Sequence, residues 1–341
     1  MTTFHANGKL LLTGEYFILD GAVGLALPTK FGQTLTVRDR FSEEHLDNNP
    51  SVIWQAHEKK LFDKSVDFAC DQTNPIWIEF EKKGYLKDLF LYFEMTISNF
   101  KINEEENEVN LRLSNIFKEI RNLDQSFLKD SRSLKIETYF DFPQNWGLGS
   151  SSTLISLLSQ WSGVDAYELL AKTFGGSGYD IACATAKSAI SYQLVYSPQP
   201  TVDRRLLTVD FQPSFSNHLY FVHLGKKQNS REGIQHYKNL TVDKSDYIEQ
   251  ISALTQKIIH AKELDEFCYY MEVHENIVAN VLNLRKVKEL YFSDFPGTIK
   301  SLGAWGVDFI LVASDESPEM ITTYFQQKGF STLLSYKDMI L

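Results

Sequence analysis

The amino-acid sequence predicts a mixed α/β protein of two domains. Its 341 residues exceed what one compact core of ordinary size holds, so two domains sharing an interface suit the length. Strand-like alternation, as in Leu134–Phe140, occurs together with helix-like spacing, as in Ser150–Trp161. A composition of 43% hydrophobic and 23% charged residues is that of a globular protein rather than a disordered or fibrous one.

The expected elements follow one another along the chain. Lys9–Leu19 predicts two short strands meeting at a bend at Gly14, and Gly21–Pro28 continues as a turn and a buried strand. Further strands are expected at Thr34–Arg38, Ile76–Glu81, Phe90–Ile97, Leu134–Phe140, Leu219–Leu224 and Phe309–Ala313. Helices are expected at Leu111–Leu128, Ser150–Trp161, Ala166–Phe174, Tyr179–Lys187, Ser245–Ala261, Glu263–Asn283 and Pro318–Lys328. Ser197–Arg205, which holds two prolines, suggests a turn or an inter-domain crossing.

Charge and cysteine usage narrow the class of protein. A net charge of −10 without a basic run longer than a pair argues against nucleic-acid binding, although a few placed cations suffice for a small acidic substrate. Cys70, Cys183 and Cys268 lie far apart and form no CxxC pair, which favours reduced thiols. The chain starts without a signal-peptide pattern and has no apolar run of membrane-spanning length, so we expect a cytoplasmic protein with no membrane partner.

The sharpest feature is the segment GLGSSST at 147–153, between an expected strand and an expected helix. Glycines let the backbone approach a bulky anion, and the helix start offers free N–H groups and the positive end of its dipole. Serine hydroxyls are suited to phosphate oxygens or Mg²⁺, which prefers oxygen ligands. The segment therefore predicts a cradle for nucleotide phosphates.

One simpler interpretation of the loop stays open. The loop is neither a Walker A motif, since no GK[ST] ends it, nor a GxGxxG motif. A serine-capped helix after a glycine turn is common, but capping explains one serine rather than three after two glycines.

Five segments resemble the motifs of one family. PxxxGLGSSS, at Pro143–Ser152, is similar to the second motif of the GHMP kinases, and GKLLLTGEYFILDG, at Gly8–Gly21, to the first. KSLGAWGVDF, at Lys300–Phe309, resembles the third motif, usually KxSGAGGGD in phosphomevalonate kinases. GSGYDIACA, at Gly176–Ala184, looks like GSGFDVAAA of that branch, and GKKQNSREGI, at Gly225–Ile234, is similar to a stretch near the substrate.

The resemblance spans residues 8–309 and implies a fold and a cofactor. The implied fold has an N-terminal domain like the second domain of ribosomal protein S5, at 1–195, and a ferredoxin-like C-terminal domain, at 205–341, with the site between them. The cofactors are ATP and Mg²⁺. The implied ATP-binding residues are Gly147, Leu148, Gly149, Ser150, Ser151 and Ser152.

Two charged residues are the expected catalytic groups. Asp180 aligns with the aspartate that accepts the proton of the substrate hydroxyl or orients its oxygen, and its alternative is a helix cap after Gly178. Lys9 is suited to lowering the pKa of that hydroxyl or to stabilising the negative charge of the phosphoryl group during transfer. The alternative interpretation of Lys9 is an exposed lysine at the start of a strand.

Metal and acceptor contacts follow from the same resemblance. Ser151 is the expected Mg²⁺ hydroxyl, with Ser150 and Ser152 as rivals, and Glu168 is the expected carboxylate although the family spacing falls on Leu169. Acceptor contacts are expected from Glu15, Tyr16, Ser177, Gly178 and Ser230. Lys226, Lys227 and Arg231 form either a cationic wall for an acidic substrate or a solvated turn.

The resemblance implies transfer of the ATP γ-phosphoryl group to phosphomevalonate or mevalonate in isoprenoid synthesis, with a homodimer left open. A sugar kinase, an ATP-consuming decarboxylase and a non-catalytic nucleotide-binding relative are the alternatives. The last is motivated by Trp305 and Val307, which stand where the third motif usually has glycines, and by the displaced glutamate.

Overall fold

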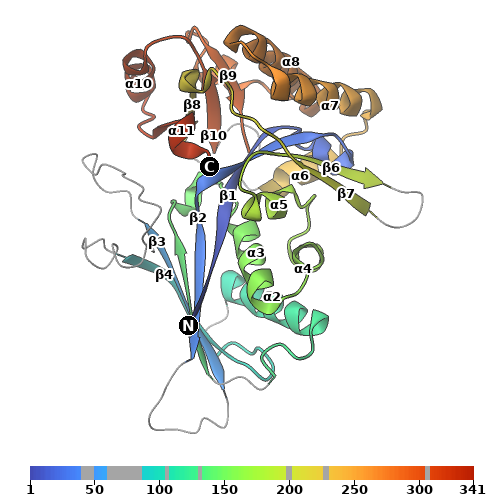
Figure 1. Ribbon diagram of the computed structural model, residues 1–341, viewed down its shortest axis with the longest axis vertical. Coiled ribbons are helices and arrows are strands. Elements are labelled where there is room, and N and C mark those ends of the chain that lie inside the picture. Colours follow the sequence, from blue (N-terminus) through green and yellow to red (C-terminus); the bar gives the residue numbers. More distant parts are fainter. Residues whose placement is uncertain are drawn as a thin grey trace. The chain divides into compact units, whose positions relative to one another are not determined.

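A computed structural model describes residues 1–39, 50–59, 87–103, 107–129, 133–196, 202–225, 230–303 and 308–341. The chain forms two compact units that interleave along the sequence (Figure 1). The first unit comprises residues 1–6, 31–144 and 157–173, and the second comprises 7–30, 145–156 and 174–341. The division into 1–195 and 205–341 stays a prediction.

The first unit is built on a sheet in the order β4–β3–β5–β2. Its elements are β3 (Ser51–Lys59), β4 (Lys87–Thr96), α2 (Glu108–Leu123), β5 (Leu134–Phe140), α4 (Ala166–Thr173), the end of β2 (Gly24–Asp39) and the end of α3 (Ser150–Ser162). β5 pairs antiparallel with β2, Gln33 opposite Phe140, and parallel with β3. Its alternating residues Leu134, Ile136 and Phe140 are buried, as the period of two predicts.

The second unit holds the remaining elements. Its strands and short helices are β1 (Thr2–Thr13, from residue 7), η1 (Phe17–Asp20), the start of β2, η2 (Gln144–Trp146, from residue 145), β6 (Ile190–Tyr196), β7 (Val202–Thr208), η3 (Ser216–His218), β8 (Leu219–His223), β9 (Thr298–Ser301), β10 (Phe309–Ala313) and β11 (Leu333–Ser335). Its helices are the start of α3, α5 (Tyr179–Thr185), α6 (Ser230–Lys238), α7 (Ser245–His260), α8 (Leu264–Leu282), α9 (Val287–Tyr291), α10 (Pro318–Gln327) and α11 (Tyr336–Met339).

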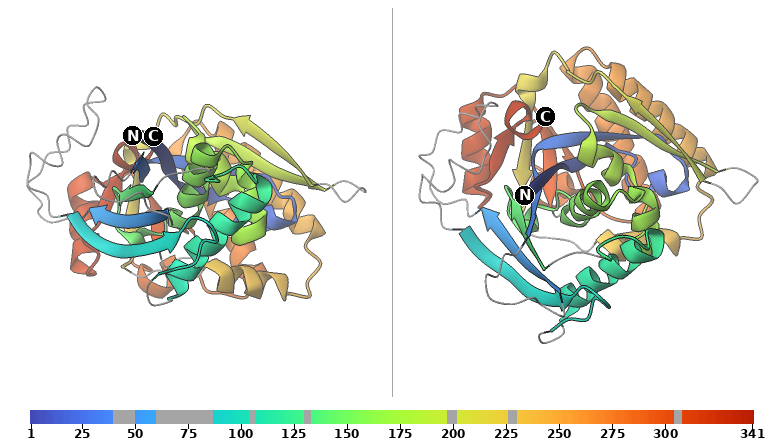
Figure 2. Two further views of the ribbon diagram at one scale, coloured as in Figure 1. Left: turned by 90° about the horizontal axis from the view of Figure 1, so that it is seen from below. Right: turned by 60° about the horizontal axis from the view of Figure 1, so that its bottom comes forward.

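An antiparallel sheet in the order β11–β8–β10–β9 has its two faces covered by different helices. Val222, Ile310 and Ile299 lie on one face and pack with Ile321 and Phe325 of α10. The neighbouring residues of the strands point to the opposite face, toward α8. Helices α7 and α8 run side by side in Figures 1 and 2.

The clearest difference from the expected elements follows Gly14. The second strand predicted for residues 15–19 is wrong, because β1 ends at Thr13 and a turn leads into the 3₁₀ helix η1. Glu15, Tyr16 and Phe17 are all buried, so the segment carries no alternation that would separate a buried strand from a buried turn. Residues 202–205 of the expected crossing belong to β7, which pairs antiparallel with β6. The strand expected at Ile76–Glu81 lies outside the described residues.

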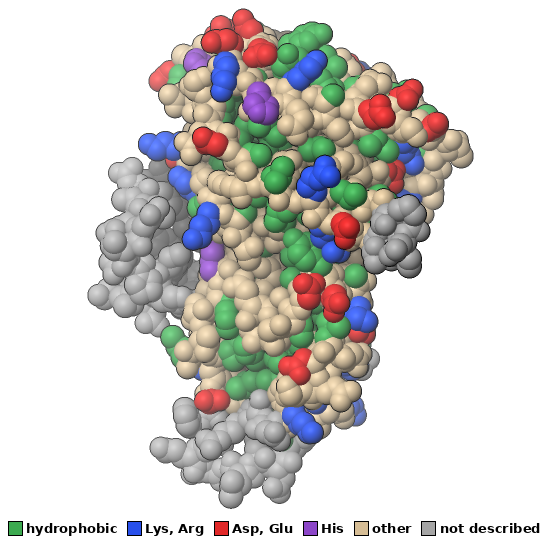
Figure 3. Space-filling model, turned by 45° about the vertical axis from the view of Figure 1, so that its right-hand side comes forward, with side chains coloured by type: hydrophobic (Ala, Val, Ile, Leu, Met, Phe, Trp, Pro, Cys, Tyr) green, Lys and Arg blue, Asp and Glu red, His purple; other side chains and the backbone are tan. Residues whose placement is uncertain are grey.

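Surface features agree with the composition. In the view of Figure 3, Lys and Arg side chains are scattered among Asp and Glu side chains. Within the described ranges, no helix combines the length and the apolar character needed to cross a bilayer.

Candidate active site

The glycine loop lies against strand β1 of the second unit. Gly147 and Gly149 have φ angles of +67° and +94°, which residues with a Cβ rarely adopt. The Lys9 amide donates to Leu148 O at 3.0 Å, and Lys9 Nζ donates to Gly147 O at 3.4 Å. The side chain and the backbone of one lysine therefore both hold the loop.

Helix α3 begins immediately after the loop. Its first intrahelical bond runs from Thr153 N to Gly149 O, so the amides of Ser150, Ser151 and Ser152 precede the helical ladder. Ser151 is exposed, whereas Ser152 is buried and donates to Gly149 O at 2.9 Å. Amides that precede the helical ladder, a helix dipole and an exposed hydroxyl at one end of a 13-residue helix fit the phosphates of a nucleotide.

Lys9 also connects the loop to the start of α5. Its ammonium nitrogen lies 5.7 Å from the centre of the Tyr179 ring. Burial lowers the pKa of Lys9, but Tyr179, Asp180 and Asp308 together outweigh burial and raise it. Lys9 is therefore a cation at neutral pH, next to the loop and to two carboxyl groups.

Asp180 is half-buried beside that cation. Burial raises the pKa of its carboxyl above the ordinary value, against the opposing effects of Lys9, the Ile181 amide and the Ser152 hydroxyl. The Ile181 amide donates to Asp180 Oδ1 at 3.1 Å. A carboxylate with a raised pKa is a stronger proton acceptor than an exposed one, which suits a general base.

A second carboxylate, Asp308, packs against the loop from the side of β10. A Cβ built on Gly147 would lie 2.4 Å from Asp308 Oδ2, and one on Gly303 would lie 3.1 Å from the same atom. Only glycine at position 147 leaves room for this carboxylate.

Tyr16 borders the site from the turn after β1. It has a φ of +60°, stacks on Tyr237 with ring centres 5.7 Å apart, and is only 9% exposed. A Cβ added to Gly233 of α6 would lie 2.3 Å from the Tyr16 hydroxyl. Burial raises the pKa of Tyr16, and the nearby charges of Glu15, Tyr179 and Asp308 raise it further.

The other residues predicted to contact the acceptor or the metal do not all lie at the glycine loop. Ser177 is buried and its carbonyl accepts from Tyr192 Oη at 2.5 Å, and Gly178 precedes α5 with a φ of +87°. Glu168 belongs to the first unit, where it is exposed in the first turn of α4. Ser230 begins α6, but its side chain lies outside the described part of the chain.

Several expectations fall on residues that the structure does not describe. They concern Lys226, Lys227, Trp305, Val307 and the side chain of Arg231. Over the described ranges, no group of three or more His, Cys, Asp or Glu side chains gathers as metal ligands. Mg²⁺ commonly uses one or two protein ligands together with phosphates and water, so the Ser151 hydroxyl at the loop fits such a site.

Sequence reasoning missed a buried polar cluster beneath this site. His274 is fully buried in α8 and accepts a hydrogen bond from the Gly14 amide at 3.0 Å. Lys300 is also fully buried and forms ion pairs with Glu15 and Glu275. The sequence contains one indication of this cluster. Lys300 is a charged residue within a motif that lies next to a buried strand.

On the ATP-binding role that the motif resemblance implies for this loop, Gly149→Ala is expected to raise the KM for ATP about tenfold, which corresponds to ~1.4 kcal/mol of lost binding. The added Cβ would lie 2.8 Å from Ser152 Oγ and 3.2 Å from Lys9 Cε, so the loop must move away from the start of α3. Gly329→Ala is the matched control, because Gly329 has a φ of +89° and open space around it. Steady-state kinetics that show the same KM for both variants would contradict a binding role for the loop.

Comparison with known proteins supports the architecture rather than a specific activity. By sequence, no family model and no curated protein matches the chain. By structure, it is similar to a mevalonate kinase of Methanococcus jannaschii at 14% identity, a TM-score of 0.63 and coverage of 98% of this chain and 96% of that one.

Two other solved structures align over nearly the whole chain. Streptococcus pneumoniae phosphomevalonate kinase, in complex with phosphomevalonate and AMPPNP, has 16% identity, a TM-score of 0.61 and coverage of 98% and 100%. Lactococcus lactis galactokinase, complexed with galactose, has 10% identity, a TM-score of 0.61 and coverage of 98% and 92%. All three are GHMP kinases, and the predicted two-domain α/β fold is confirmed.

Proposed function

We propose that this chain, which has the fold of the GHMP kinases, is an ATP-dependent kinase of small hydroxylated acids. The observation that carries the proposal is the convergence of Lys9, Asp180 and the amides of Ser150–Ser152 at the glycine loop. Phosphoryl transfer requires mainly positioning and charge neutralisation, and these groups supply both.

Each group has a separate task. The loop from Gly147 to Gly149 and the amides that follow it bind the nucleotide phosphates, and Lys9 balances their charge. Asp180 accepts the proton of the acceptor hydroxyl or orients its oxygen. ATP, when bound, supplies the γ-phosphoryl group, and Mg²⁺ would be held by the Ser151 hydroxyl. Glu168, which belongs to the first unit, stays a prediction of the motif resemblance.

The acceptor is proposed to be phosphomevalonate or mevalonate. Tyr16, Ser177, Gly178 and Ser230 are the proposed contacts, and buried Glu15 would act through Tyr16. The motif resemblance favours phosphomevalonate, and an acidic acceptor suits a site that keeps a protonated lysine. Galactose is the alternative acceptor, since a galactokinase shares the fold.

A coupled assay of ADP release tests the proposal. Mevalonate, phosphomevalonate and galactose are compared at equal concentration with ATP and Mg²⁺, with an acceptor-free reaction as the baseline. We expect turnover with one of the two mevalonate compounds, and its loss on chelation of Mg²⁺. ATP binding without phosphorylation of any acceptor would instead indicate a non-catalytic relative, and carbon dioxide release from diphosphomevalonate would indicate a decarboxylase.

A further inference from the structure

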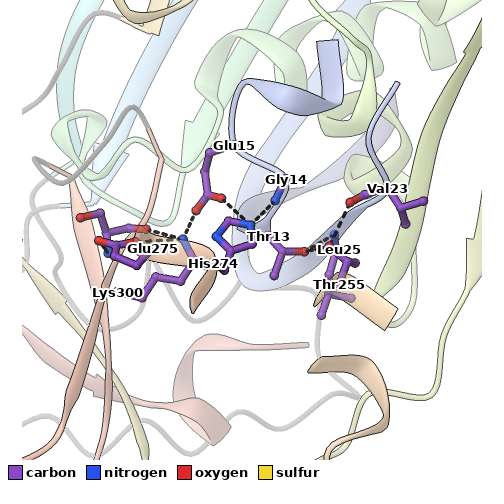
Figure 4. Close-up of polar contacts among 10 residues, drawn as sticks. Thr13, Gly14, Glu15, Val23, Leu25, Thr255, His274, Glu275 and Lys300 are labelled. Carbon is purple, nitrogen blue, oxygen red and sulfur yellow. Dashed lines mark hydrogen bonds and ion pairs between the residues drawn. The ribbon is translucent and has the colours of Figure 1, made fainter. Parts of the chain in front are cut away.

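Four ionisable side chains meet in the interior of the second unit (Figure 4). Glu15 comes from the turn after β1, His274 and Glu275 from α8, and Lys300 from β9. None of the four is more than 2% exposed. Charged groups buried to this degree require partners, and the pattern of partners decides their protonation.

All three N–H donors of the Lys300 ammonium have acceptors. They are Glu15 Oε1, Glu275 Oε2 at 3.4 Å and Ser301 O at 3.0 Å. A neutral amine would forfeit two ion pairs and a hydrogen bond, so Lys300 is the fixed cation of the cluster. Burial lowers the pKa of Lys300, but Glu15 and Glu275 outweigh burial and raise it.

The two carboxylates differ in what faces their oxygens. Both oxygens of Glu275 face donors, because Oε1 accepts from the Ser301 amide at 3.0 Å and Oε2 accepts from Lys300. Of the described side chains, Lys300 donates to Glu15 at Oε1, and the backbone amide of Glu15 also faces its own carboxyl group. Its buried Oε2 has no hydrogen-bond partner among the residues that the structure describes.

A ring nitrogen close to that oxygen is itself an acceptor. Glu15 Oε2 lies 3.5 Å from His274 Nε2, which already accepts from the Gly14 amide at 3.0 Å. The Nε2 atom therefore carries no proton, and an ionised Glu15 would set an anionic oxygen against a lone pair. One ammonium, two carboxylates and a neutral imidazole would also leave a net buried charge of −1, which one proton on Glu15 Oε2 removes.

We propose that Glu15 holds one exchangeable proton in this cluster and is a positioning residue for the turn that presents Tyr16 to the active site. The positioning role rests on the proposed kinase function, whereas the proton does not. Burial, opposed by Lys300, raises the pKa of Glu15 to about 7, and the charge of Glu275 acts in the same direction as burial. The groups that face Glu15 are Lys300 from β9, His274 and Glu275 from α8, and Tyr16 beside it. Burial and then Lys300 hold the pKa of His274 well below its ordinary value, so Glu15 is the group that titrates.

The protonation state of Glu15 affects the active site through the turn after β1. Gly14 is fixed by His274, its carbonyl accepts from the Ile18 amide at 2.9 Å, and Tyr16 keeps a φ of +60° between these anchors. Such a backbone conformation persists only where its surroundings hold it. Loss of the proton from Glu15 sets an anion against Nε2, loosens the Gly14 contact and displaces Tyr16.

Two isosteric variants separate this mechanism from general stabilisation. In Glu15→Gln the amide oxygen keeps the bond from Lys300 and the NH₂ group faces Nε2, so the variant reproduces the protonated form at every pH. In Glu275→Gln the NH₂ group must face a donor, because both oxygens of Glu275 are acceptors. We therefore expect Glu275→Gln to be less stable than wild type at all pH values, with the titration of Glu15 moved to lower pH because the charge of Glu275, which raises the pKa of Glu15, is gone.

The measurements are urea unfolding and acceptor kcat/KM between pH 5 and pH 8. The unfolded carboxyl loses its proton near its ordinary pKa of 4.5 and the folded one near 7, so rising pH favours unfolding of wild type. The unfolding constant of wild type relative to Glu15→Gln should rise roughly 10²-fold over this range. The kcat/KM of wild type should fall with a midpoint near 7, and that of Glu15→Gln should lack this step.

Equal pH dependence in wild type and Glu15→Gln would overturn the proposal. If Glu15→Gln does not fold, wild-type protein labelled with ¹³C at the glutamate carboxyls decides, since one resonance must titrate near pH 7 and its absence would overturn the proposal. Unfolding and resonance measurements need no acceptor. If no acceptor is phosphorylated, the kinase proposal is refuted. The unfolding and resonance measurements still test the proton on Glu15.

Discussion

Asp180→Asn is expected to lower kcat at least ~10²-fold, with little change in the KM for ATP. The amide keeps the size of the side chain and can still accept from the Ile181 amide, but it cannot take the proton of an acceptor hydroxyl. The half-buried carboxyl beside Lys9 has a raised pKa, which makes it a stronger proton acceptor than an exposed carboxylate. Steady-state kinetics with the acceptor identified in the ADP-release assay give both constants.

Asp246→Asn serves as the control for this substitution. Asp246 is also an acidic residue in the first turn of a helix of the second unit, but it is exposed on α7. Its replacement should leave kcat unchanged. Turnover of Asp180→Asn within a factor of about three of wild type would remove Asp180 from the mechanism, since general-base catalysis contributes more than that.

Several regular elements were predictable because their hydrophobic patterns are local, although α2 begins three residues and ends five residues before its predicted bounds. Leu134–Phe140 alternates and forms β5 with the predicted bounds, and Ser150–Trp161 forms α3 with one residue more. Helices α7, α8 and α10 end within one residue of their predicted bounds. Packing reinforces the periodicity in these segments, so local sequence and tertiary structure agree.

The turn after β1 was not predictable in this way. Its conformation depends on contacts with residues that are remote in the sequence, since Glu15 pairs with Lys300 at a separation of 285 residues and Gly14 with His274 at 260. Lys300 stands in the strand TIKS, where a lysine beside apolar residues usually marks the solvent face. Burial of all four residues of β9 reverses that interpretation.

The candidate site was predictable in part, through the ordered motifs. They nominated Lys9, Asp180 and the glycine loop, which the fold brings together in the second unit. Tyr179, whose ring lies beside Lys9, was not singled out, because an aromatic residue before an acidic one has no distinctive pattern. The packing of Asp308 on Gly147 also depends on two loops that are separated along the chain.

Lys300→Met should lower the free energy of unfolding by about 3–5 kcal/mol at pH 8, the usual cost of leaving a buried charge without its partner. Methionine has nearly the length of lysine, so packing changes little while Glu15 and Glu275 lose their common cation. Protonation of carboxyl groups in the folded state relieves part of this loss, so the destabilisation should be smaller at pH 5. Urea unfolding at both pH values measures the difference.

The background in which Lys300 is replaced distinguishes lost charge pairing from lost packing. In a Glu15→Gln/Glu275→Gln background no carboxylate remains unpaired, so Lys300→Met should cost clearly less than in wild type. Lys238→Met, at an exposed position of α6, should change stability by no more than about 0.5 kcal/mol. An equal loss in both backgrounds would mean that the shape of the lysine, and not its charge, holds the turn after β1 to strand β9.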